Sequence, residues 1–128
     1  MKIGLQWLFL VAALAIVLVA FAIIQPRFMN HVNRARTFDY MGEIYVTITR
    51  TLETQPLKEY DAVSEARKIF PSLPVSNGAI VDAWGNPMRI SIERIKDGFH
   101  VTLTSAGRDG VFGTKDDLVE NYMLPDTK

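Results

Sequence analysis

The sequence predicts an α+β protein in which a long N-terminal helix packs on a small antiparallel β-sheet. Three observations predict this class: an uninterrupted apolar run near the N-terminus, a stripe of apolar residues at helical spacing after it, and alternating apolar and polar residues further along. A chain of 128 residues has room for one small domain and an anchor.

The composition excludes several classes of function. Fourteen Lys and Arg residues balance fourteen Asp and Glu residues, so the formal net charge is zero. A chain with no basic excess lacks the electrostatic footprint of a nucleic-acid-binding protein, so we expect no nucleic-acid partner. The chain also has no cysteine, which excludes disulfides, a thiolate nucleophile and cysteine-ligated zinc or iron–sulfur sites.

The first element is a transmembrane anchor. Residues 7–24 carry no polar side chain, and together with residues 3–6 they reach the ~20 residues that a helix needs to cross the hydrocarbon layer. A buried core helix would need a larger protein around it. A cleaved signal peptide would have a shorter apolar region and a small-residue cleavage site. We therefore predict a retained, single-pass anchor over residues 1–26 and a separate domain over residues 27–128.

The second element is an amphipathic helix over residues 27–54 that continues from the anchor, with a bend at Pro26 because proline removes one helical hydrogen bond. Polar residues, including Thr47, lie mostly on its opposite side. We expect the first half of the apolar stripe to pack on copies of the protein or on a partner, and the second half to pack on the sheet. The stripe consists of Phe28, Val32, Ala35, Phe38, Met41, Tyr45, Ile48 and Leu52.

The remaining regular elements are a short helix and a hairpin. Gln55-Pro56 ends the long helix, and a second helix is predicted over residues 58–69. Residues 88–104 form a predicted β-hairpin, because apolar and polar residues alternate on both sides of the turn Lys96-Asp97-Gly98. The apolar face of this hairpin needs a cover, which the end of the long helix can provide.

Residues 105–119, with the sequence S-A-G-R-D-G-V-F-G-T-K-D-D-L-V, combine three glycines with three aspartates. Calcium binds carboxylate and carbonyl oxygens, and a glycine-rich loop can turn its own carbonyls inward. The spacing is not that of an EF-hand, and a solvated, turn-rich loop is the alternative. The candidate ligands are the side chains of Asp109, Asp116 and Asp117, with the backbone carbonyls of Ala106, Val111 and Val119 as additional candidates.

The ion and the orientation of the anchor are linked. A flexible, carbonyl-rich loop suits Ca²⁺ better than Mg²⁺, and a weak calcium site fills only outside the cytoplasm. The charges indicate the opposite topology, because Arg27, Arg34 and Arg36 follow the span whereas Lys2 precedes it. We expect a structural Ca²⁺ ion and an extracytoplasmic domain.

Two motifs carry a resemblance to a family. D-A-W-G-N-P at residues 82–87 is followed, after the hairpin, by S-A-G-R-D-G at 105–110 and G-T-K-D-D-L at 113–118. Their order and spacing resemble the calcium-binding C-terminal domain of type II secretion major pseudopilins, which belong to the type IV pilin-like superfamily. The resemblance implies a pilin-like fold, calcium on the three aspartates, and a filament subunit of the bacterial inner membrane with its domain in the periplasm. The implied partners are other pseudopilin subunits or the protein itself, through the N-terminal helix, and the inner-membrane secretion machinery.

The N-terminal motif departs from this family. If Gly4 corresponds to the processing glycine, Pro26 falls where the family carries proline, but Phe9 stands where the family carries glutamate. In the family that carboxylate pairs with the N-terminal amine of a neighbouring subunit, and a buried charge pair fixes register. A diverged subunit is therefore expected. The alternative is a non-polymerising, membrane-anchored extracytoplasmic adaptor of the same fold.

Catalysis is a third class of function. Three aspartates can hold Mg²⁺ for hydrolysis, but the sequence places no obvious base or nucleophile beside them. His31 lies next to the anchor and His100 lies on the polar face of the hairpin, both typical surface positions. We therefore expect no enzymatic activity.

Overall fold

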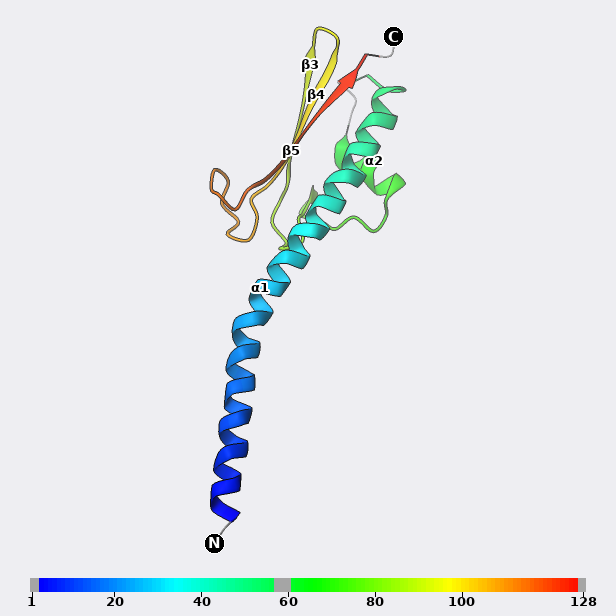
Figure 1. Ribbon diagram of the computed structural model, residues 1–128. Coiled ribbons are helices and arrows are strands. Elements are labelled where there is room, and N and C mark those ends of the chain that lie inside the picture. The colour runs from blue at the N-terminus through cyan, green and yellow to red at the C-terminus, as the bar shows by residue number, and fades with distance from the viewer. Residues whose placement is uncertain (1–2, 57–60, 127–128) are drawn as a thin grey trace. The chain divides into compact units, whose positions relative to one another are not determined.

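The computed structural model describes residues 3–56 and 61–126, and it confirms the α+β class (Figure 1). The chain divides into two compact units, Met1–Val32 and Asn33–Lys128. The strands pair antiparallel, as a two-stranded sheet of β1 and β2 and as a three-stranded sheet in the order β3-β4-β5. The elements are α1 (Ile3–Leu52), α2 (Ala62–Ile69), β1 (Val75–Ser76), β2 (Ala79–Ile80), β3 (Arg89–Ile95), β4 (Gly98–Ser105) and β5 (Leu118–Pro125).

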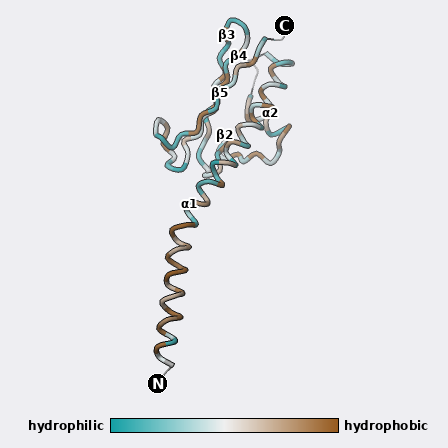
Figure 2. The backbone as a smooth tube through the Cα atoms, in the orientation of Figure 1, coloured by the Kyte–Doolittle hydropathy of each residue, from teal (hydrophilic) through white to brown (hydrophobic). Residues whose placement is uncertain are grey.

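The first unit is the N-terminal part of α1. Its apolar side chains are exposed, including Trp7 at 63% and Phe9 at 68%, and Figure 2 shows hydrophobic residues along its length. Among the described residues, α1 is the helix long and apolar enough to cross a membrane. The helix continues without interruption through Pro26, as predicted, and the bend expected there stays a prediction.

In the second unit, α1 buries one face. Thr37, Met41, Ile44, Ile48 and Thr51 follow one another at steps of three or four residues and are buried. Thr47 is also fully buried, so the prediction that it lies on the polar side is wrong. A buried threonine is tolerated because its hydroxyl finds a local acceptor, and here Thr47 Oγ1 donates to the Glu43 carbonyl at 3.0 Å.

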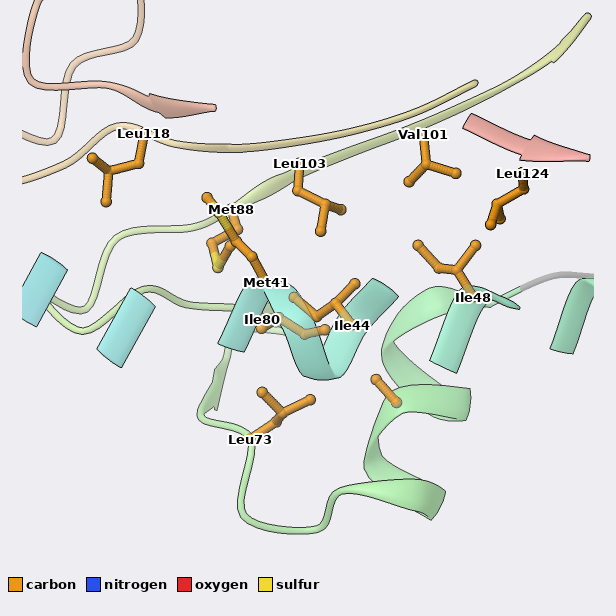
Figure 3. Close-up of a cluster of buried hydrophobic side chains, with 11 residues drawn as sticks. Met41, Ile44, Ile48, Leu73, Ile80, Met88, Val101, Leu103, Leu118 and Leu124 are labelled. Atoms are coloured by element: carbon orange, nitrogen blue, oxygen red, sulfur yellow. The ribbon is translucent and has the colours of Figure 1, made fainter. Parts of the chain in front are cut away.

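The core lies between this face of α1 and the three-stranded sheet. Figure 3 shows Met41, Ile44 and Ile48 directed toward side chains of β4 and β5, such as Val101 and Leu124. Beside this core, the rings of Tyr45 and Tyr122 stack with their centroids 4.0 Å apart. The predicted cover of the hairpin by the end of the long helix is therefore confirmed.

The smaller elements differ from the prediction at their ends. The described part of the second helix begins at Ala62, and the Asp61 carboxylate caps it by accepting hydrogen bonds from two backbone amides. The predicted residues 58–60 lie outside the described residues. The hairpin is confirmed, with β3 and β4 joined where Ile95 pairs with Gly98. The sheet also contains β5, which the sequence analysis did not identify as a strand.

Candidate metal site

The aspartate loop occupies residues 106–117 between β4 and β5. Ser105 and Leu118 pair with each other at the two ends of the loop, so the sheet holds these ends together. The predicted loop of residues 105–119 therefore includes strand residues at both ends. Val119, one of the candidate carbonyl ligands, lies in β5 opposite Thr104.

Asp109 lies in the first half of the loop with both carboxylate oxygens hydrogen-bonded. Oδ1 accepts from the Val111 amide at 3.0 Å, and Oδ2 accepts from the Thr114 hydroxyl at 2.8 Å. The amide and then the hydroxyl stabilise the ionised form, so they lower the pKa of Asp109 below its ordinary value. The side chain is thus a carboxylate whose orientation is fixed by its own loop.

Asp117 lies at the far end of the loop, and its two oxygens differ. Oδ2 accepts a hydrogen bond from the Gly113 amide at 2.8 Å. Oδ1 is buried and has no hydrogen-bond partner in the part of the chain that the structure describes. An unsatisfied buried carboxylate oxygen is unfavourable, and a bound cation is one group that can satisfy it.

Asp116 lies between Asp109 and Asp117 in the sequence, and it is half-buried. Its backbone is linked to the Asp109 side chain by hydrogen bonds through Thr114. The Asp116 amide donates to Thr114 Oγ1 at 3.3 Å, and the same hydroxyl contacts Asp109. Thr114 Oγ1 also lies 3.3 Å from the Val111 carbonyl, one of the candidate carbonyl ligands, but its one proton goes to Asp109 at the shorter distance. The Ala106 residue, another such candidate, is buried.

The loop thus contains the oxygen donors that calcium prefers, but not a ready-made triad. Within residues 3–56 and 61–126, no three His, Cys, Asp or Glu side chains form a group that could hold a metal ion. The donor chemistry nevertheless fits calcium, because a carboxylate oxygen that accepts one hydrogen bond keeps a free lone pair. The Oδ1 atom of Asp117, which accepts no hydrogen bond in the described residues, adds an oxygen that a cation can satisfy.

Asp82 lies within the first of the two motifs, but sequence reasoning assigned no role to this residue, which connects them. Asp82 is 2% exposed, and its Oδ1 accepts from the amides of Trp84 and Asn86 at 3.0 and 2.9 Å. Its Oδ2 accepts from the Ser105 hydroxyl at 2.6 Å. Asn86 Nδ2 also donates to the Gly107 carbonyl at 3.0 Å. The signal in the sequence was an aspartate placed to bond amides two and four residues ahead, as in an Asx-turn.

A second contact holds the tip of the loop. The Arg89 guanidinium of β3 lies over the ring of Phe112, 3.7 Å from its centroid. This geometry is that of a cation–π pair. The loop is therefore tied to the sheet near its middle as well as at its two ends.

Comparisons of the chain with protein-family models, with curated proteins and with solved structures found no match. The family suggested by the two motifs therefore stays a prediction.

Proposed function

We propose that the protein is a structural, pseudopilin-like subunit of a type II secretion or type IV pilus-like filament. In this proposal α1 anchors it in the bacterial inner membrane, and the unit Asn33–Lys128 lies in the periplasm. The observation that carries the proposal is α1 itself, which is apolar and exposed in its first part and built into a domain core in its last part.

The exposed apolar part of α1 needs a cover. Soluble proteins rarely expose contiguous apolar surface of this extent. Lipid covers such a helix before assembly, and the helices of neighbouring subunits can cover it in a filament. The proposed partners are therefore other pseudopilin subunits or copies of this chain, together with the inner-membrane machinery that assembles them.

We further propose that a Ca²⁺ ion draws Asp109, Asp116 and Asp117 together when it binds the loop, with backbone carbonyls completing its shell, since these side chains are not grouped around a metal position in the described residues. The unpartnered Oδ1 of Asp117 supports this site. An ion that binds the folded loop and not the unfolded chain stabilises the fold by mass action. The ion would have a structural role, and no step of catalysis is assigned to it.

Crosslinking in the membrane tests the filament. Since the chain has no cysteine, Val11→Cys and Val17→Cys, both at exposed positions of α1, introduce unique thiols. We expect disulfide-linked dimers of the chain, or links to pseudopilin-like subunits that carry a cysteine, in membranes of the native host. A Lys96→Cys variant in the exposed turn of the hairpin serves as the control. Persistence of the monomer at both α1 positions would contradict the filament.

Thermal melting tests the calcium site. The full chain in detergent should melt at a higher temperature in millimolar calcium than in chelator, and Asp116→Ala combined with Asp117→Ala should abolish the difference. Glu93→Ala combined with Asp97→Ala removes the same charge at exposed positions of the hairpin and should keep it. Identical melting curves for the unmodified protein with and without calcium would rule the site out.

The second candidate function is a non-polymerising extracytoplasmic adaptor with the same anchor and loop. Phe9 favours this candidate, because a phenylalanine cannot form the charge pair that the glutamate forms in the resembled family. The same thiols distinguish the two functions. Crosslinking to a single unrelated protein, without dimers of this chain, would indicate the adaptor.

A further inference from the structure

We propose, on the basis of the calcium site described above, that Asp82 is a positioning residue for the metal loop. It acts through Ser105 and Asn86 and does not bind the ion itself. Asp82 lies outside the loop, in the turn that precedes β3, and 23 residues separate it from Ser105.

The Asp82 carboxylate determines which way the Ser105 hydroxyl points. A serine hydroxyl has one proton to donate, and Ser105 directs it to Asp82 Oδ2 at 2.6 Å. The lone pairs of Ser105 Oγ are then free to accept, and Oγ accepts the amide proton of Gly107 at 3.0 Å. Because Asp82 and Ser105 are both buried, water does not compete for these bonds.

The same turn also holds the backbone carbonyl of Gly107. Asn86 Nδ2 donates to the Gly107 carbonyl at 3.0 Å, and the Asn86 amide is itself fixed by Asp82. Both backbone polar groups of Gly107 are therefore held by the turn, one through Ser105 and one through Asn86.

Gly107 in turn sets the place of Asp116. Gly107 has a φ of 67°, and a Cβ added to it would overlap the backbone carbonyl oxygen of Asp116. The two backbones thus lie in direct contact across the loop. Asp82 therefore holds Gly107 in place through Ser105 and Asn86. Gly107 in turn supports the backbone of Asp116, a proposed calcium ligand.

The turn also connects to α1. The Ala83 amide donates to Thr37 Oγ1 at 3.1 Å, and Thr37 is fully buried. A contiguous set of hydrogen bonds and backbone contacts thus joins α1 to the loop. Since coupling between sites is reciprocal, calcium binding should strengthen the packing of this turn on α1, and loss of the turn should weaken calcium binding.

Isothermal titration calorimetry, in which calcium is added to the full chain in detergent micelles, tests the proposal. Ser105→Ala removes the acceptor of the Gly107 amide, and Asn86→Ala removes the donor to its carbonyl. We expect each variant to raise the calcium Kd roughly ten-fold, because a smaller fraction of loops is in the competent conformation. Ser91→Ala, an exposed serine-to-alanine change on β3, should leave the Kd unchanged.

Amide hydrogen exchange gives a readout that a purely structural role would not move. Calcium should slow exchange at Gly107 and Ala83 in the unmodified protein, and Ser105→Ala should remove most of that calcium-dependent slowing. Melting temperatures lowered equally with and without calcium, at an unchanged Kd, would overturn the positioning role while leaving the calcium site intact. No calcium binding by the unmodified protein would overturn both. If Asp82→Asn does not fold, Ser105→Ala and Asn86→Ala still decide.

Discussion

Gly107 and Gly113 both adopt positive φ in the aspartate loop, at 67° and 87°, but only Gly107 lies against other backbone. Gly113→Ala should destabilise the protein by roughly 1–2 kcal/mol, the cost of a left-handed conformation for an L-residue. Gly107→Ala adds an overlap with the Asp116 carbonyl and should cost at least about 3 kcal/mol. Chemical denaturation in detergent measures both, and equal losses would show that Gly107 and Asp116 are not in contact.

The hydrogen bonds to Asp109 predict a dependence on acid. The Val111 amide, and then the Thr114 hydroxyl, lower the pKa of Asp109 in the folded state. A lowered folded pKa means that the stabilisation is complete above the unfolded value of about 3.9 and is lost as the pH falls through the folded value. Carboxyl NMR should therefore place the midpoint for Asp109 below that of an unfolded peptide.

Thr114→Val removes one of these donors and should move the Asp109 pKa part of the way back up, while the Val111 amide keeps it below the peptide value. A midpoint at or above the peptide value in the unmodified chain would contradict the hydrogen bonds described for this carboxylate.

The sequence was enough to place the three candidate ligands in one loop, but not to show how their oxygens are arranged. Asp109, Asp116 and Asp117 stand within one short segment, so their presence in the same loop follows from the sequence. Which of their oxygens already accept hydrogen bonds depends on loop conformation, which residue spacing does not determine. The Asp82–Ser105 bond was out of reach because it joins the turn before β3 to the end of β4, which only the folded sheet brings together.

At the scale of elements, periodicity predicted α1 and the β3–β4 hairpin because both present a regular apolar face over several turns or residue pairs. β5 was missed because apolar and polar residues do not alternate regularly along its sequence. Its inward positions include Glu120 opposite Leu103, while Val119 and Met123 are exposed. β1 and β2 have two residues each, too few for a period, and the Asn77-Gly78 turn between them was the sequence signal.

The packing of α1 on the sheet predicts a contrast between neighbouring positions on one helix. Ile48 is fully buried in the core, whereas Val46 is 36% exposed. Ile48→Ala should reduce the free energy of unfolding by about 2–5 kcal/mol, because it leaves a cavity between helix and sheet. Val46→Ala should change it by less than about 0.5 kcal/mol. Thermal and denaturant melts of the full chain in detergent measure the difference, and similar losses at both positions would contradict the described face.

At the scale of the whole molecule, charge and metal chemistry favour opposite orientations. Arg27, Arg34 and Arg36 follow the apolar span, and the first acidic residue after it is Asp39, so the positive-inside rule favours a cytoplasmic domain. A weak calcium loop favours the outside, because such sites need the high calcium found there.

We expect the metal chemistry to indicate the true side, because the positive-inside rule is a statistical bias with exceptions. A reporter that is active only outside the cytoplasm, fused after Lys128, should therefore be active in intact bacteria. A second fusion, to a reporter active only in the cytoplasm, should be silent. The reverse pattern would place the loop where calcium is too scarce to fill it, and both the structural ion and the periplasmic filament subunit would have to be abandoned.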